Sequence, residues 1–474
     1  MNFEAIIGLE IHVEMKTKSK MFSSAPVVFG ALPNSAVDLT DMAFPGTLPI
    51  VNKQAVINAI RVAHALHMEI DDELWFDRKN YFYSDLPKGY QITQQRRPLG
   101  KNGYLEIETP NGKKKIAIER IHLEEDTCKQ LHFSDYTLLD FNRAGVPLIE
   151  IVSHPELKNG LEAMRYVENI RSIVQYLDVS NGKMEEGSLR CDVNISLRKE
   201  GENKLGTKVE IKNLNSIANI EKAIDFEVKR QSELLKQGVK IIQETRRYDD
   251  DLKETISMRV KSDAVDYKYF VEPNIVPIKL TEEFIKTAIE TSSELASVKL
   301  TRYLNLGLNE YDANIILSSK ETANYFDEAL KTKANPKLLA NWLIVDIQAV
   351  LNKEEISIEN FKITPENLSQ LVKMIESNQI SNKQARDVFI KMLENNESPN
   401  VIADKLGFVL ISDEIQILKY VSEVLDVNEQ SIIDFKNGKD RAFGYLVGQV
   451  MKASHGKVNP SLTAKILTEE LKRR

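Results

Sequence analysis

The run Gly8–Glu14, which reads GLEIHVE, alternates apolar and polar residues with a period of two. That period predicts a β-strand whose apolar side chains face a core while Glu10, His12 and Glu14 project from the opposite face. Two carboxylates and an imidazole in a row are suitable side chains for a metal site or an acid–base site. The alternative is an exposed antiparallel strand with ordinary polar residues on its solvent face. The other motifs of the chain decide between these interpretations.

Composition restricts the compartment and the partners. The two cysteines, Cys128 and Cys191, are too few for a disulfide framework or a cysteine-rich zinc site, which favours the reducing cytoplasm. No run of ~18 apolar residues occurs and the first residues form no basic and apolar leader, so we expect no membrane span and no secretory signal. Because the net charge is −7, binding to RNA would require local basic patches.

Strand patterns dominate residues 1 to about 280. Alternating or strongly apolar runs predict strands at 116–118, 148–152, 189–196 and 209–211. Apolar residues at helical spacing predict helices at about 156–178 and 217–237, the second with Ser216 as N-cap and Gly238 as its stop. Because helices do not follow every strand, we predict an α+β fold with a mainly antiparallel sheet and flanking helices, not a doubly wound parallel sheet.

Helical signals dominate after Pro273 and Pro277. One of them is Thr364-Pro365-Glu366, which supplies an N-cap, a first-turn proline and a first-turn acid. A weaker boundary falls near Gly407. For a chain of 474 residues we therefore predict three domains, at 1–292, 293–406 and 407–474, the last two all-α.

Two further segments contain acidic residues at positions where an unpaired negative charge would be energetically unfavourable. The run His122–Asp126 contains three adjacent carboxylates, which favour a bound cation such as magnesium, although a solvated acidic turn is the common alternative. Glu150 interrupts an otherwise apolar strand. Charged residues are rarely buried without a partner, so this glutamate slightly favours a functional interpretation over an outward-facing strand residue.

The strand at 189–196 carries a row of polar side chains on one face. Arg190, Asp192 and Asn194 alternate with apolar residues, and Cys191 falls on the apolar face as a core residue. The next strand adds Lys208, Glu210 and Lys212 on one face. Such a row could hold a nucleotide and its metal ion.

The segment 76–91 is rich in aromatic, basic and amide side chains, which suit contacts to phosphate and to a base. A surface loop anchored by buried tyrosines is the more ordinary explanation for this segment taken alone. The chain has no P-loop, no dinucleotide-binding glycine motif and no His-Glu-x-x-His, so a nucleotide site would be of a less common type. It also has no convincing serine or cysteine triad.

Together these segments resemble the GatB family, the B subunit of the bacterial glutamyl/aspartyl-tRNA amidotransferase, nearly from end to end. The resemblance rests on Gly8–Glu14, Arg78–Tyr83, Pro87–Gln91, His122–Asp126, Asn142–Glu150, Glu185–Asn194, Lys212–Ser216, Gln243–Arg246, Gly444–Lys452 and Asn459–Pro460. This many long motifs in the same order are highly specific.

The resemblance implies a cytoplasmic ligase that uses ATP and Mg²⁺. Members of the GatB family phosphorylate the side-chain carboxylate of misacylated Glu-tRNA(Gln) or Asp-tRNA(Asn). Ammonia released from glutamine by an amidase partner then reaches the activated carboxyl through a channel, and a small third protein holds the other two together. The family fold is a cradle domain with the kinase site, then a helical domain and a tail domain that contacts tRNA.

On this basis we expect four sets of site residues. The catalytic and metal-binding set is Glu10, His12, Glu125, Glu150 and Asp192, with Glu124 either nearby or merely adjacent in sequence. The ATP-binding set is Lys79, Ser188, Arg190 and Asn194. The ammonia-channel set is Lys88, Arg259, Asp266 and Glu272. The tRNA-contacting set is Lys436, Lys439, Arg441, Lys452 and Lys457. Glu14 has no obvious partner and is left out.

The chain departs from the family pattern at two places. Many relatives bind a structural zinc through cysteine pairs near the N-terminus, but the matching stretches here, Phe22–Ala25 and Val37–Asp41, contain no cysteine. We therefore expect no zinc and a loop held by packing. The run Tyr269–Asn274 lacks a proline and an acid that are common in relatives, which weakens the channel assignment around Glu272.

Two other functions stay open. A tRNA-presenting protein without chemistry would also use the basic tail, but clustered carboxylates would repel its phosphates. A stand-alone metal-dependent hydrolase would be active without partner proteins.

Overall fold

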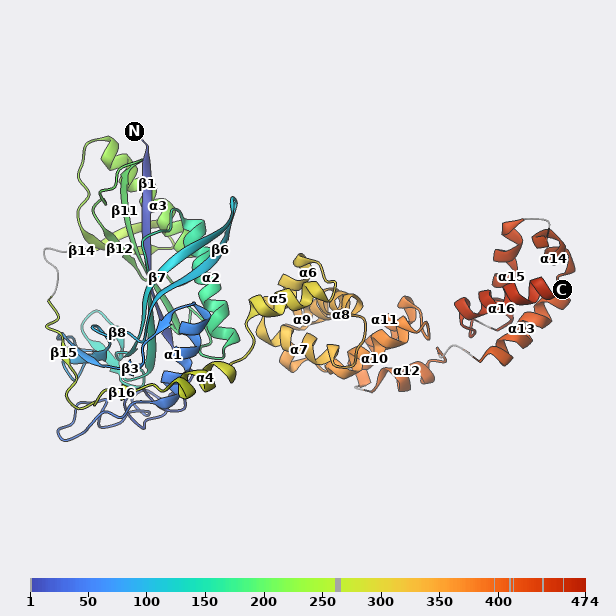
Figure 1. Cartoon of the computed structure of the whole chain (residues 1–474), viewed down its shortest axis with the longest axis horizontal. Coiled ribbons are helices and arrows are strands. Elements are labelled where there is room, and N and C mark those ends of the chain that lie inside the picture. The colour runs from blue at the N-terminus through green and yellow to red at the C-terminus, as the bar shows by residue number, and fades with distance from the viewer. Residues whose placement is uncertain are drawn as a thin grey trace. The chain divides into compact units, whose positions relative to one another are not determined.

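The computed structural model describes residues 2–260, 266–395, 397–408, 411, 413–436, 439–454 and 456–474. The chain divides into two compact units, Met1–Ala296 and Ser297–Arg474 (Figure 1). The further predicted division near residue 407, and with it the three-domain scheme, stays a prediction. Within the described residues, no helix combines the length and the apolar character needed to cross a membrane.

The described part of the first unit is built on a nine-stranded sheet with the order β14-β13-β12-β11-β1-β10-β7-β6-β2. Strand β1 (Phe3–Glu14) lies near its centre, beside β11 (Leu189–Lys199) (Figure 1). It is antiparallel to both β11 and β10 (Pro147–Ser153). The other strands are β2 (Glu69–Ile70), β6 (Gly100–Thr109), β7 (Gly112–Glu125), β12 (Val209–Lys212), β13 (Glu244–Asp249) and β14 (Glu254–Val260). Only the β12–β13 pairing within this sheet is parallel, so the predicted α+β fold with a mainly antiparallel sheet is confirmed.

The alternation of apolar and polar residues in β1 places its apolar side chains in the core, as predicted. Leu9, Ile11 and Val13 are at most 1% exposed and belong to one hydrophobic core with residues from three helices. Those helices are α1 (Lys53–Ala65), α2 (Gly160–Tyr176) and α3 (Ile217–Lys236). Because alternate side chains point to opposite faces of a strand, this packing forces Glu10 and His12 onto the face away from the core.

The helices flanking the sheet begin and end close to the predicted residues. Ser216 accepts a hydrogen bond from the Asn219 backbone and caps α3 as predicted. Helix α2 begins at Gly160, four residues later than expected, because Leu157 exchanges backbone hydrogen bonds of 3.0 and 3.2 Å with Ile7 of β1. The preceding residues are therefore held beside the sheet and cannot start the helix.

Small sheets complete the first unit. Strand β4 (Asp77–Asn80) pairs with β5 (Tyr90–Thr93) and with β15 (Phe270–Val271), so a distant segment returns beside the aromatic and basic run at 76–91. The remaining elements are β3 (Glu73–Leu74) with β16 (Ile278–Lys279), β8 (Lys129–His132) with β9 (Thr137–Asp140), and α4 (Glu282–Glu290).

A buried ion pair holds the N-terminal loop at the place where relatives were expected to bind zinc. Lys20 Nζ lies 3.0 Å from Asp41 Oδ2, and both side chains are almost completely buried. Lys20 also donates to the Phe141 carbonyl at 3.2 Å. The loop is therefore fixed by a charge pair within its hydrophobic surroundings. The absence of zinc itself stays a prediction.

From residue 296 onward the described regular structure is helical. Thr364 caps α10 (Pro365–Glu376) by accepting from the Asn367 backbone, as predicted. Ile417, Leu446 and Leu467 belong to a separate core near the C-terminus. The other elements are α5 (Ala296–Asn305), α6 (Glu310–Leu317), α7 (Lys320–Leu330), α8 (Pro336–Asn341), the π-helical segment Trp342–Ile347, α9 (Gln348–Glu354), a 3₁₀ turn at Ile358–Asn360, α11 (Asn382–Asn395), α12 (Pro399–Lys405), α13 (Glu414–Asp426), α14 (Glu429–Lys436), α15 (Asp440–Ala453) and α16 (Pro460–Arg473).

Two fully buried tyrosines give a matched test of the packing. The Tyr166 hydroxyl has no hydrogen-bond partner among the described residues, whereas the Tyr303 hydroxyl donates to Asp327 at 2.9 Å. Tyr166→Phe should leave the free energy of unfolding unchanged or raise it, and Tyr303→Phe should lower it by about 1–3 kcal/mol. Urea unfolding of both variants measures this. A loss for Tyr166→Phe as large as that for Tyr303→Phe would contradict the packing described.

Candidate active site

A row of four polar side chains crosses the sheet on the face away from the core. The strand register places His122 of β7 opposite Glu150 of β10, Glu150 opposite His12 of β1, and His12 opposite Arg190 of β11. Side chains directly opposite one another on adjacent strands are close enough to interact. Accordingly, Glu150 Oε2 lies 3.1 Å from His122 Nε2 and 3.5 Å from His12 Nε2.

Glu124 completes this cluster from β7. Its carboxylate oxygens lie 3.8 Å from His12 Nε2 and 3.6 Å from His122 Nε2. One ligand atom from each of His12, Glu124 and Glu150 falls within 4.8 Å of the others, which is close enough for all three to hold one metal ion. We call these three residues the first acidic group.

The pKa values in and around the first acidic group are shifted by burial and by the charges of neighbouring side chains. Burial disfavours an imidazolium, but Glu150 and Glu124 outweigh burial and raise the pKa of His122 to about 9. The same balance raises the pKa of His12. Burial would raise the pKa of Glu150, but the two histidines hold it well below its usual range. The two histidines and Glu150 therefore stabilise one another's charged forms.

A second acidic group lies on the same face, on β1, β11 and β12. It consists of Glu10, Asp192 and Glu210, whose ligand atoms also fall within 4.8 Å of one another. Asn194 Nδ2 donates to Glu10 Oε1 at 2.9 Å, and Thr245 Oγ1 donates to Glu210 Oε2 at 3.0 Å. These hydrogen bonds fix the two carboxylates from opposite sides.

The prediction of one cluster of five residues needs correction, because the structure separates them into two groups. His12 and Glu150 belong to the first acidic group, and Glu10 and Asp192 to the second. Glu125 belongs to neither: its carboxylate forms an ion pair with Lys88 and accepts a hydrogen bond from the Ile92 backbone. The physical reason is that successive strand residues point to opposite faces, so Glu124 joins the first acidic group in place of Glu125.

Glu210 was not predicted as a ligand, although a signal for it was present. The sequence showed it on one face of a short strand between Lys208 and Lys212. What the sequence did not show is the pairing of Glu210 with Asn194, which carries it into the neighbourhood of Asp192.

The predicted ATP-binding residues have four different environments. Burial disfavours the Lys79 ammonium, but Glu124 and Glu150 outweigh it and raise the pKa of Lys79. The Lys79 side chain therefore lies in the field of the first acidic group, with Nζ 5.0 Å from the centroid of the Tyr267 ring. Asn194 holds Glu10 in the second acidic group.

The other two predicted ATP contacts are engaged elsewhere. The Ser188 hydroxyl accepts from the Lys183 backbone N–H at 2.9 Å and donates to the Lys183 carbonyl at 3.0 Å, so it closes a turn. Arg190 donates to Asp126 and lies 3.9 Å from Glu14. Burial and the nearby Asp126 carboxylate raise the pKa of Glu14 to about 8, which agrees with leaving Glu14 out of the ligand set.

Two of the predicted ammonia-channel residues form ion pairs whose cationic members lie near one aromatic ring. Lys88 pairs with Glu125, and Glu272 pairs with Arg78 through contacts of 2.5 and 3.1 Å. The Tyr90 ring centroid lies 5.6 Å from Lys88 Nζ and 3.9 Å from Arg78 Cζ. Of the other two, Asp266 is exposed, and the Arg259 side chain is outside the described residues.

The predicted tRNA-contacting residues are all exposed, as a role in binding would require. They are Lys436, Lys439, Arg441, Lys452 and Lys457. Lys439 also forms a 3.0 Å ion pair with Asp434. Their contact with tRNA stays a prediction.

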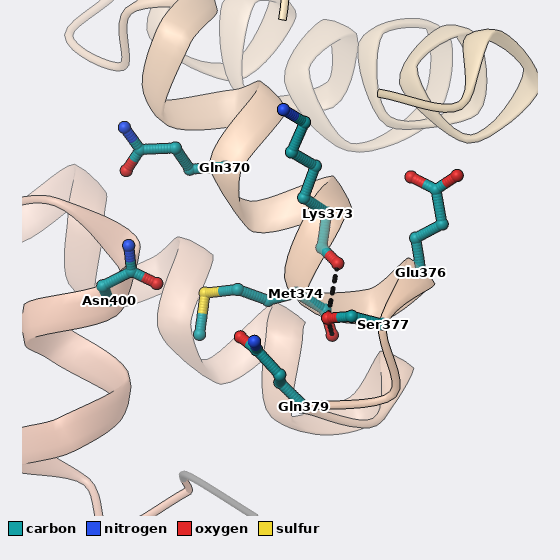
Figure 2. A pocket seen from close by; sticks show the side chains of 7 residues that line it. All are labelled: Gln370, Lys373, Met374, Glu376, Ser377, Gln379 and Asn400. Atoms are coloured by element: carbon teal, nitrogen blue, oxygen red, sulfur yellow. Dashed lines mark hydrogen bonds between the residues drawn. The ribbon is translucent and has the colours of Figure 1, made fainter. Parts of the chain in front are cut away.

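A surface hollow of about 490 Å³ lies in the second unit, between α10 and α12. Figure 2 shows that amide side chains, Lys373 and Met374 line it. It contains no residue of the predicted site. The acidic groups on the sheet, not this hollow, therefore define the candidate active site.

Comparisons with known proteins match almost the whole chain. Residues 5–286 match the GatB/GatE catalytic domain, and residues 324–471 match the GatB domain. The chain is similar to proteins named as the B subunit of aspartyl/glutamyl-tRNA(Asn/Gln) amidotransferase from Oceanobacillus iheyensis (51% identical), Geobacillus thermodenitrificans (50%) and Staphylococcus saprophyticus (50%). Each alignment covers 100% of both chains.

The first unit of this chain is an α+β domain with two acidic groups on one face of its sheet, and helices follow it. Together with the match to the catalytic domain, this places the chain in the GatB/GatE class. Within this class, the chain belongs to the GatB family, the B subunits of aspartyl/glutamyl-tRNA(Asn/Gln) amidotransferase. The resemblance inferred from the motifs is therefore confirmed.

The two adjacent acids Glu124 and Glu125 give a direct test of the first acidic group. Glu124→Gln removes a ligand and should weaken Mn²⁺ binding by at least roughly tenfold, whereas Glu125→Gln should leave it unchanged. Isothermal titration of the full chain measures both affinities. An unchanged affinity for Glu124→Gln would show that Glu124 does not belong to the metal site, and equal losses would show that Glu125 belongs to it as well.

Proposed function

We propose that this chain uses ATP and Mg²⁺ to phosphorylate the side-chain carboxylate of glutamate or aspartate carried by a misacylated tRNA. Ammonia then replaces the phosphate to give Gln-tRNA(Gln) or Asn-tRNA(Asn). The observation that carries this proposal is the first acidic group, held on the face of the sheet away from the core and within the electrostatic reach of Lys79. The names of the relatives, B subunits of aspartyl/glutamyl-tRNA(Asn/Gln) amidotransferase, support the choice of substrate.

The residues fit the metal that this chemistry needs. Carboxylate oxygens and one imidazole suit a divalent cation, and the strand register brings them together from three different strands. Two buried polar atoms, His122 Nδ1 and Asn194 Oδ1, have no hydrogen-bond partner among the described residues. Such atoms beside both acidic groups are expected where an ion or its water molecules complete the hydrogen bonding. His12, Glu124 and Glu150 would hold one ion, and Glu10, Asp192 and Glu210 a second.

The reaction needs positive charge at the transferring phosphoryl group. A carboxylate is a poor acyl donor because its leaving group would be oxide, and phosphorylation gives it a better one. An oxygen of the substrate carboxylate attacks the γ-phosphorus of ATP, the bond to the β-phosphate oxygen breaks, and ADP leaves. A bound Mg²⁺ would neutralise the phosphate oxygens. Lys79 adds a positive charge from the protein itself, and its environment keeps it protonated.

The next step forms the amide. Ammonia attacks the carbonyl carbon of the acyl phosphate, inorganic phosphate leaves, and the nitrogen loses a proton. We assign the supply of ammonia to an amidase partner, with a small third protein holding the assembly together. Lys88, Glu125 and Glu272, which meet around Tyr90, are polar and charged groups suited to a hydrophilic ammonia route. Asp266 and Arg259 are proposed to belong to the same ammonia route.

The exposed basic residues near the C-terminus are proposed to contact tRNA. These five side chains lie on or beside α14 and α15. Phosphate contacts of this kind supply affinity without reading sequence. The assembly is proposed to work in the cytoplasm, in keeping with the two free buried cysteines.

The two other functions explain less of the structure. A protein that only presents tRNA has no use for two groups of carboxylates, which repel phosphates. A stand-alone hydrolase would not require the charged residues around Tyr90 or an exposed basic tail.

The proposal predicts that ATP hydrolysis depends on both the substrate and the first acidic group. In the assembly reconstituted with the amidase and the small third protein, Glu150→Gln should reduce Glu-tRNA(Gln)-dependent ATP hydrolysis by at least roughly 100-fold. The exposed Glu106→Gln on β6 serves as the matched control and should retain the full rate. Size-exclusion chromatography checks assembly. A normal rate for the assembled Glu150→Gln variant would refute the proposed site.

A further inference from the structure

Lys212, which no step of the proposed reaction uses, lies against the second acidic group. It is the last residue of β12, two positions after Glu210 on the same strand face. Its Nζ pairs with Asp192 and lies 3.2 Å from Glu210 Oε1. One ammonium thus contacts two of the three carboxylates that define this group.

The contact is electrostatically strong. Lysine is a cation at neutral pH by its ordinary pKa of ~10.4, and its ammonium here contacts two carboxylates at ion-pair distance. The Asp192 and Glu210 side chains are only 17% and 11% exposed, which limits screening by water. Three carboxylates this close together repel one another strongly unless a cation lies among them.

An ammonium and a metal ion compete for these carboxylates. Both bind carboxylate oxygens, and two positive charges this close together repel one another. The lysine ammonium can move away from the carboxylates because it is carried on a flexible four-carbon stem. The Lys212 side chain is 35% exposed, so solvent is available to receive its ammonium.

From this geometry, and resting on the proposed metal-dependent function, we propose that Lys212 is a tethered cation that competes with a divalent ion for the second acidic group. In the metal-free protein Lys212 neutralises Asp192 and Glu210 and keeps the group assembled. A divalent ion entering between Glu10, Asp192 and Glu210 displaces the ammonium. Lys212 thereby makes the second acidic group bind metal more weakly than the first. It is a positioning residue and not a catalytic one.

The test measures metal binding and not activity. Full-length protein carrying Glu124→Gln, which removes the first acidic group as a competitor, is titrated with Mn²⁺ and followed by electron paramagnetic resonance. Adding Lys212→Met removes the charge and keeps most of the stem, and should tighten binding roughly 5- to 150-fold, the usual range of coupling between two sites. A further Glu210→Gln substitution should abolish that gain.

Matched variants separate competition from a structural effect. Lys212→Arg keeps the charge and should leave the affinity low, while Met at the exposed Lys208, just before β12, should change nothing. A lysine that only stabilises the strand would not increase metal affinity when removed. If Lys212→Met is unstable, Lys212→Gln replaces it, and urea unfolding verifies the fold of each variant.

The outcomes distinguish this inference from the proposed function. Unchanged or weaker Mn²⁺ binding by folded Lys212→Met, or by Lys212→Gln, overturns the role of Lys212 and leaves the first acidic group intact. Absence of any Mn²⁺ binding by the wild-type chain, together with tighter binding by Lys212→Met, contradicts the first acidic group and supports the tethered cation.

Discussion

The register of β1 between β10 and β11 is the constraint on which the rest of the site depends. Glu10, His12 and their partners come from strands that are more than a hundred residues apart in sequence, and only cross-strand pairing brings them together. Leu9, Ile11 and Val13 fix that register because their burial in the core allows one face of the strand and not the other. A slip by one residue would put an imidazole and two carboxylates into the core, at a cost that the fold could not offset.

The carboxylates on the polar face of the sheet also depend on nearby cations that balance their charge. The polar face of the sheet gathers carboxylates that would repel one another if left alone, and each group lies beside a cation supplied by the chain. His12 and His122 contact Glu150, Lys79 lies in the field of the first acidic group, and Lys212 pairs with Asp192 and Glu210. Such cations balance the negative charge of the carboxylates and hold them in place without a metal, so that metal binding becomes an exchange of one cation for another. Ion pairs of the same kind hold the N-terminal loop through Lys20 and surround Tyr90.

Much of this could be predicted from the sequence, and the failures have physical causes. The alternation in β1, the N-cap at Ser216 and the α+β class are local properties, and all are confirmed. The separation into two acidic groups could not be predicted, because pairing between distant strands leaves no mark in a single sequence. The sequence contained the evidence that Glu124, and not Glu125, shares a strand face with His122. Ile121 and Leu123 are apolar, so the alternation already places His122 and Glu124 on the polar face. The turn that the Ser188 hydroxyl closes depends on backbone positions that a single sequence does not show, and the role of Ser188 in ATP binding stays a prediction.

The central claim is that the first acidic group is a metal site created by the register of β1, β7 and β10. Anomalous diffraction from crystals soaked in Mn²⁺ tests it most directly, because the peak locates the ion without reference to activity. The account predicts a peak bounded by the His12 imidazole and the carboxylates of Glu124 and Glu150. A peak beside Glu125 with none between His12 and Glu150 would contradict it.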